Sequence, residues 1–187
     1  MKTILISLCT FILPSLLTGQ DYEGFDEYNL LIIKDSRFEI LAERNGEEVI
    51  KTTRETHVRL NHVSGAFYCG VQQKDLQLFT DEEFPEDMER QEGDYFRIKG
   101  TMPMDQILGN DGTDQQYKVE MSLSIFEQEI PLMFQVNVKN YQQTNVGFWV
   151  FVGAVDLDTR DLGITEFHGY NPEIKIVFSF QALKRGS

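Results

Sequence analysis

The chain has 187 residues, of which 17 are basic and 30 are acidic, so its formal net charge is −13 at pH 7. This excess of acids argues against nucleic acids and anionic membrane surfaces as partners, because binding to phosphates depends on Lys and Arg. The length suits a single domain that buries roughly 70% of the surface exposed by its unfolded chain.

An apolar stretch at the N-terminus has the features of a cleavable secretory signal peptide. Lys2 provides the positive start, residues 4–17 are mostly apolar, and small residues at 18 and 19 offer a cleavage site. The stretch is too short to cross a bilayer, which takes about 20 apolar residues, and no second long apolar run follows. We therefore expect removal of residues 1–19, a periplasmic or secreted location, and no integral membrane segment.

Cysteine usage limits the covalent chemistry of the mature protein. Cys9 would leave with the signal peptide, so Cys69 would be the only remaining thiol, and an internal disulfide is excluded. A half-buried strand position is the main interpretation of Cys69, because free cysteine behaves mostly as a small apolar residue. The alternative is a reactive thiol or an intermolecular disulfide.

Two acidic segments flank or interrupt the predicted domain. Residues 20–27 are predicted to form a flexible N-terminal segment ahead of a barrel domain at 28–187. Residues 80–94 contain eight acids and one Arg, and they form either a short solvated helix or an irregular surface loop.

Short runs with strand-like composition follow one another along the chain. Turn signals separate them, such as Asn45-Gly46, whose residues tolerate positive φ, and Ser64-Gly65. A single helical turn is predicted at residues 104–108. The strand-like runs, from which we expect about eight to ten strands, are residues 29–33, 38–42, 49–53, 57–63, 66–71, 76–79, 96–102, 117–125, 130–138, 146–157 and 174–182.

Residues 117–139 show the clearest periodicity: in two successive runs, every second side chain is apolar. Because successive strand side chains point to opposite faces, the two runs form an antiparallel hairpin over an apolar interior. The C-terminal run repeats this pattern, whereas residues 146–157 are apolar on both faces and are expected to be covered on both sides. The apolar rows are Tyr117, Val119, Met121, Leu123 and Ile125; Ile130, Leu132, Phe134, Val136 and Val138; and Ile174, Ile176, Phe178, Phe180 and Ala182.

Eight to ten short strands with almost no helical periodicity indicate an all-β sandwich or barrel. We predict an antiparallel, closed β-barrel of about eight strands with one or two short helices in its connections, because closure removes exposed strand edges. A barrel of this size either packs solid with side chains or encloses one small ligand.

Signals for catalysis and metal binding are weak. The three histidines, His57, His62 and His168, contain no pair four residues apart, and no Cys-x-x-Cys motif is present, so no metal site is predicted. The loop at residues 109–114 is interpreted as an ordinary turn rather than a calcium site. No nucleophile elbow or phosphate-binding glycine motif occurs. We therefore predict no catalytic residue and a protein that is not an enzyme.

Several short motifs follow one another in a defined order between about residues 28 and 184. They are Asp35-Ser36-Arg37-Phe38, residues 57–67, Leu123-Ser124-Ile125, Glu129-Ile130-Pro131-Leu132, Gly147-Phe148, Asp161-Leu162-Gly163-Ile164 and the terminal strand. This order resembles the YceI-like family of polyisoprenoid-binding, lipocalin-like secreted proteins. The chain departs from the family pattern at Phe126-Glu127, where a His-Gly turn is common, and at Leu162, where Phe is usual.

The resemblance implies a lipocalin-like barrel, exported across the inner membrane, with a long-chain isoprenoid lipid in its interior and no other cofactor. An apolar tunnel needs little polar recognition, because each buried methylene contributes about 0.8 kcal/mol. For each predicted lining residue, ordinary core packing is the competing interpretation. The predicted ligand-binding residues are Met121, Leu123, Leu132, Phe134, Val136, Trp149, Phe151, Ile176 and Phe178.

Two alternatives stay open. Arg160, between Asp158 and Asp161, either caps the head group of a ligand at the barrel mouth or forms a solvated ion pair. The protein as a whole is either a lipid carrier or a secreted structural or interaction protein, with a filled barrel and an acidic face that binds a partner. Formation of a homodimer is also left open.

Overall fold

The computed structural model describes residues 25–72, 76, 96–109, 114–125, 128–143, 146–162 and 169–183. The predicted signal peptide, most of the acidic segment at 20–27, the acidic segment at 80–94 and His168 lie outside the described residues, as does all but Leu76 of the expected strand at 76–79. Within the described ranges, no helix is long and apolar enough to span a membrane.

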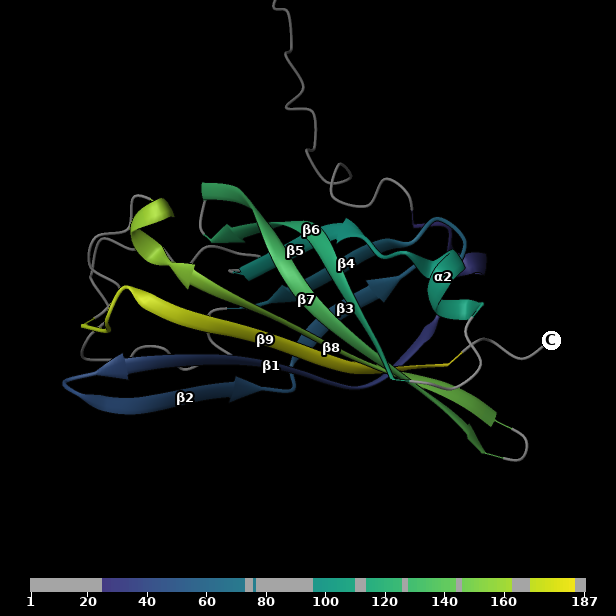
Figure 1. Cartoon of the computed structure of the whole chain (residues 1–187), viewed down its shortest axis with the longest axis horizontal. Coiled ribbons are helices and arrows are strands. Elements are labelled where there is room, and N and C mark those ends of the chain that lie inside the picture. Colours follow the sequence, from purple (N-terminus) through teal and green to yellow (C-terminus); the bar gives the residue numbers. More distant parts are fainter. Residues whose placement is uncertain are drawn as a thin grey trace, which may run out of the picture.

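The described residues form one antiparallel sheet with the strand order β2-β1-β9-β8-β7-β6-β5-β4-β3 (Figure 1). The strands are β1 (Ile32–Arg44), β2 (Glu47–Thr53), β3 (Thr56–Leu60), β4 (Ala66–Val71), β5 (Phe96–Thr101), β6 (Gln115–Ile125), β7 (Gln128–Gln143), β8 (Val146–Asp158) and β9 (Glu173–Leu183). The helical elements are the predicted turn α2 (Met104–Leu108) and the 3₁₀ turns η2 (Glu27–Asn29) and η3 (Thr159–Leu162).

The sheet closes because both of its end strands lie along β1. Phe38 of β1 lies opposite Thr53 of β2, and Leu30, just before β1, lies opposite Asn61, just after β3. Leu30 and Phe38 are eight residues apart, and so are Thr53 and Asn61, which means that one antiparallel register runs through both pairs. β2 and β3 therefore act as one strand interrupted at residues 54–55. The predicted all-β, lipocalin-like barrel of about eight strands is confirmed.

Glycines permit two of the tight turns that the barrel needs. Asn45 and Gly46 have φ values of 55° and 81°, as expected for the two-residue turn predicted between β1 and β2. Gly65 has φ 75°, and a Cβ there would lie 2.1 Å from the carbonyl oxygen of Met102. The Met102 N–H donates to the Gly65 carbonyl at 2.8 Å, which ties the segment before α2 across this end of the barrel.

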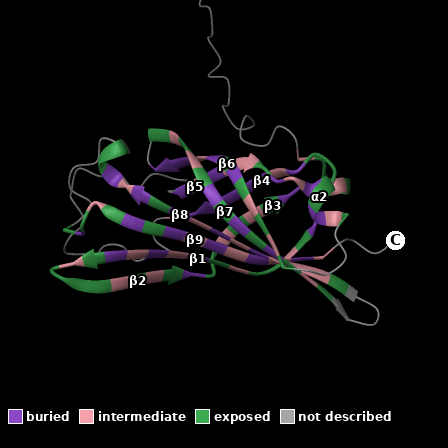
Figure 2. Cartoon of the chain, viewed as in Figure 1, coloured by how far each residue is buried: buried purple, intermediate pink, exposed green. Residues whose placement is uncertain are grey.

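The predicted apolar rows face the interior. Figure 2 shows buried residues alternating with exposed or half-buried ones along β7 and β9. Seven phenylalanines are almost completely buried: Phe38, Phe67, Phe96, Phe134, Phe151, Phe178 and Phe180. Cys69 is a free thiol in the same core and is only 1% exposed, so it is more deeply buried than the sequence indicated.

Two local predictions are corrected. Residues 32–33 and 38–42 of the two expected strands belong to one strand, β1, with an irregularity where Asp35 adopts φ 46° and the register with β9 shifts, whereas Asn29 ends η2. The expectation that both faces of residues 146–157 are covered is wrong for the outer face, because Val150 and Val152 are only half-buried while Phe151 is fully buried. A barrel wall has one inner face, and its outer face meets solvent unless a second layer covers it.

Candidate functional site

The nine residues predicted to line a tunnel all belong to, or pack against, one apolar cluster inside the barrel. Leu132 and Trp149 are partly buried at its edge. The other seven are at most 1% exposed: Met121, Leu123, Phe134, Val136, Phe151, Ile176 and Phe178. The structure thus brings these residues together, and their role as ligand contacts stays a prediction.

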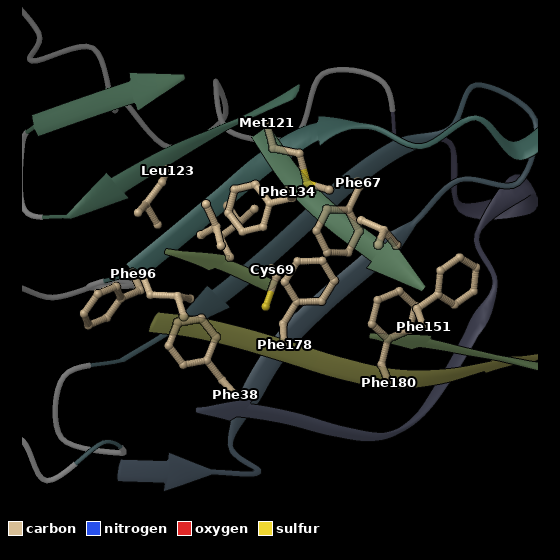
Figure 3. Packing of buried hydrophobic residues seen from close by; sticks show 14 of the residues in the cluster. Phe38, Phe67, Cys69, Phe96, Met121, Leu123, Phe134, Phe151, Phe178 and Phe180 are labelled. Carbon is tan, nitrogen blue, oxygen red and sulfur yellow. The ribbon is translucent and has the colours of Figure 1, made fainter. Parts of the chain in front are cut away.

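Aromatic rings fill the described part of this interior (Figure 3). The rings of Phe151 and Phe180 stack with centroids 4.7 Å apart, and Phe67 lies 5.1 Å from Phe178 and 5.7 Å from Phe180. Side chains with so little exposed surface contact protein atoms on all sides. A long apolar ligand that binds among them must therefore displace aromatic rings.

Gly153 makes this packing possible, and sequence reasoning missed it. It lies on β8 opposite Phe178 of β9, and a Cβ at this position would come within 2.1 Å of the Phe178 ring. The signal in the sequence is a glycine at an inward position of a strand whose other inward residues are large. It marks where the tip of the Phe178 ring approaches the backbone of β8.

Trp149 places a polar group at the edge of the apolar core. It lies on β8 between Asn140 of β7 and Ala182 of β9, and its Nε1–H is buried with no hydrogen-bond partner among the described residues. Buried polar atoms are usually paired, so an orphaned indole N–H is a potential donor to a ligand oxygen.

Tyr117 lies on β6, packs against the same core, and donates a hydrogen bond from its hydroxyl to Gln115 Oε1. The pKa of Tyr117 is raised above its ordinary value, first because burial disfavours the phenolate and second because of the charge of Asp105. The phenol is therefore a neutral hydrogen-bonding group at neutral pH.

The histidines do not gather into a metal centre within the described ranges, where no group of three or more His, Cys, Asp or Glu residues could hold a metal ion. His62 Nδ1 lies 2.7 Å from the carbonyl oxygen of Asn29, a contact that joins the start of β1 to the end of β3. His57 is exposed on β3. The absence of a metal from the protein stays a prediction.

An open acidic depression of about 650 Å³ lies where the ends of β1, β2, β8 and β9 meet. Its lining combines apolar side chains such as Leu41 with one cation, Lys175. The carboxylates around it belong to Glu43, Glu48, Asp156, Asp158 and Glu173. Such a surface would favour a cationic partner over an anionic one.

Arg160 forms the solvated ion pair that the sequence offered as one of two alternatives. Its Nε lies 2.8 Å from Asp158 Oδ1, and 58% of its side chain is exposed. Hydrogen bonds from the Arg160 side chain and backbone lower the pKa of Asp158 below its ordinary value. A pair this exposed contributes little to stability.

The fold and the interior together define the class of protein: a lipocalin-like antiparallel barrel around an aromatic-rich apolar core. No protein-family model matches the chain, and no curated protein matches it. Among solved structures, the chain is similar to a polyisoprenoid-binding domain from Saccharophagus degradans that is implicated in plant cell wall breakdown. The TM-score is 0.63 at 9% sequence identity, and the match covers 83% of this chain and 98% of that domain.

At 9% identity, this likeness shows a shared fold and not a shared activity. It spans almost the whole of the solved domain, so the two barrels have the same general architecture. The resemblance to the YceI-like family is thereby supported at the level of the fold, while membership of that family stays a prediction.

Proposed function

We propose that this protein is an exported, non-enzymatic barrel that binds a long-chain isoprenoid lipid, of quinone or polyprenyl type, in its apolar interior. The observation that carries the proposal is the single apolar cluster enclosed by the barrel wall, in a fold shared with a domain described as polyisoprenoid-binding. Transfer of each methylene from water to such an interior is favourable by about 0.8 kcal/mol, so even a short prenyl chain gains substantial free energy.

The polar end of the ligand would find one donor inside the barrel. The unpaired Nε1–H of Trp149 suits a quinone carbonyl or a phosphate oxygen. The signal-peptide features of residues 1–19 support export, since they would deliver the barrel to a compartment bounded by membranes that contain such lipids.

A second candidate function is supported by the tight packing of the described core. The phenylalanines there are at most 2% exposed, which fits a filled barrel that serves as a rigid scaffold. In that case, the acidic depression around Glu43, Glu48 and Glu173 would bind a cationic protein partner.

Lipid extraction and uptake distinguish the two candidates. The chain without residues 1–19, purified without detergent, is extracted with organic solvent, and the extract is analysed by mass spectrometry for a prenyl lipid at a ratio near one per chain. Because Trp149 is the only Trp and faces the interior, quenching of its fluorescence by an added prenyl quinone reports uptake independently.

We expect saturable quenching by a long-chain prenyl quinone and weaker quenching by a quinone without a tail. As a control, uptake by the wild-type protein is also measured by mass spectrometry after gel filtration, which separates binding from the optical signal. A protein that carries no lipid and takes up no added quinone would favour the scaffold function.

A further inference from the structure

The barrel wall has one line along which neighbouring strands are not paired in a ladder. Every other pair of adjacent strands is joined by five to eleven residue pairs in register. Between β1 and β3, the pairing within the fully described stretch 29–62 is the single bridge Leu30–Asn61. We call the line between residues 32–37 and residues 55–59 the seam.

Irregularities on both sides of the seam explain why no ladder forms. On β1, Asp35 has a positive φ and the register with β9 shifts between Lys34 and Arg37. On the facing side, the strand is interrupted at residues 54–55, between β2 and β3. A bulge bends its strand and disrupts pairing locally, and here the irregularity in β1 faces the break between β2 and β3, so no ladder continues along this stretch.

The seam lacks the backbone ladder that joins the other adjacent strands. Backbone hydrogen bonds fix one end, where the Leu31 N–H donates to the Leu60 carbonyl at 3.0 Å. In its middle, the Thr56 hydroxyl donates to the Ser36 hydroxyl at 2.6 Å. A side-chain hydrogen bond therefore crosses the middle of the seam, whereas backbone ladders join the other pairs of adjacent strands.

A hollow of about 490 Å³ opens at the seam on the outside of the barrel. Its rim is polar, with the hydroxyls of Ser36 and Thr56 beside Arg59. Ile33 and Val58 also line it, and both pack against the buried core, so these two side chains separate the hollow from the barrel interior.

The end of the barrel beside α2 offers a less favourable route. Met104 and Ile107 of α2 are 2% and 0% exposed, and the preceding Met102 is bound to Gly65. A ligand that enters there must displace this helical turn from the core. At the seam, where no backbone ladder has to open, it must break the hydrogen bond between the Ser36 and Thr56 hydroxyls and move the side chains of Ile33 and Val58.

We infer that the seam is the lateral portal of the barrel. The apolar chain of the lipid passes between Ile33 and Val58 into the core, along an entry lined by the hydroxyls of Ser36 and Thr56. This inference rests on the proposed function, because it assigns the route of the same ligand.

A reversible crosslink across the seam tests the portal. The Ser36 and Thr56 hydroxyl oxygens are 2.6 Å apart, so sulfur atoms at these positions reach bonding distance with little backbone movement. The test variant is Ser36→Cys with Thr56→Cys. The matched control is Glu120→Cys with Met133→Cys, an exposed pair that lies directly opposite across the β6–β7 ladder.

The measured quantity is the rate at which a long-chain prenyl quinone quenches Trp149. We expect oxidation to slow uptake at least tenfold in the seam variant, reduction to restore it, and the control crosslink to leave it unchanged. Uptake at the wild-type rate by the oxidised seam variant would overturn the portal. Failure of the wild-type protein to take up quinone would instead overturn the proposed function, and the portal with it.

A second variant keeps the test independent of the crosslink. Val58→Ala removes bulk between the hollow and the core, so uptake is expected to become several-fold faster than in the wild type. Val49→Ala, at another aliphatic residue that packs against the core from β2, is the control and should leave the rate unchanged. Equal rates for Val58→Ala and the wild type would contradict a route past this side chain.

Discussion

The wall at β9 and the wall at the seam are built differently. β9 has ladders on both sides, with eight residue pairs to β1 and eleven to β8, and its inward row is completely buried. The seam has no backbone ladder, and the hydrogen bond between the Ser36 and Thr56 hydroxyls crosses it beside the hollow. Local opening requires the least free energy where buried contacts and backbone hydrogen bonds are fewest. One barrel thus combines a rigid side with a side that can open.

Removal of a ring from the rigid side should have the largest effect. Phe178→Ala deletes a side chain that contacts Phe67 and lies against Gly153, so the free energy of unfolding should fall by about 3–5 kcal/mol. Denaturant unfolding measures the loss. Ile50→Ala on β2 is the control, because this side chain is 56% exposed and its loss should change stability by only about 0.5 kcal/mol. Equal losses in the two variants would show that the interior is not packed.

Addition of a methyl group beside the same ring should have the next largest effect. In Gly153→Ala, the new Cβ meets the Phe178 ring at 2.1 Å, so overpacking should reduce the free energy of unfolding by about 1–3 kcal/mol. In the double variant with Phe178→Ala, the ring is gone and the methyl group has space. The double variant should therefore lose less than the sum of the single losses, and strict additivity would disprove this contact.

On the side that opens, Ser36→Ala should reduce stability by only about 1 kcal/mol, because it removes one partly buried hydrogen bond. Hydrogen exchange sharpens the comparison: amides at the seam should exchange faster in this variant, while those of β9 should not change. Faster exchange throughout the barrel would mean that the seam does not open separately.

The smallest effect is expected at the exposed ion pair between Asp158 and Arg160. Because the folded-state pKa of Asp158 is lowered, the pair stabilises the fold above about pH 4 and this contribution is lost as the pH falls through the folded pKa. Thermal unfolding of Asp158→Asn should differ slightly from that of the wild type at neutral pH and low salt. The two should converge in acid, and a difference that grows in acid would contradict the assignment.

The alternating rows of β6, β7 and β9 could be predicted residue by residue, because a strand with one buried face must place apolar side chains at every second position. The hairpin at Asn45-Gly46 and the turn α2 also depend only on residues close together in the sequence, and both predictions are confirmed. The outer face of β8 was misjudged, because composition does not tell whether an apolar outer row meets solvent or a second layer. The candidate lining residues were found together for the same periodic reason, while their contact with a ligand stays a prediction.

The amino-acid sequence by itself determined which side of each strand is apolar, where the chain turns, and that strands rather than helices build the domain, since these depend on neighbours within a few residues. Only the tertiary structure decided that β2 and β3 share one side of β1, that Phe178 lies against Gly153, and that Ser36 meets Thr56 across an unpaired seam. Each of these facts joins residues 20 or more positions apart or depends on strand register around the closed barrel, and no local pattern specifies which strands become neighbours when a sheet closes.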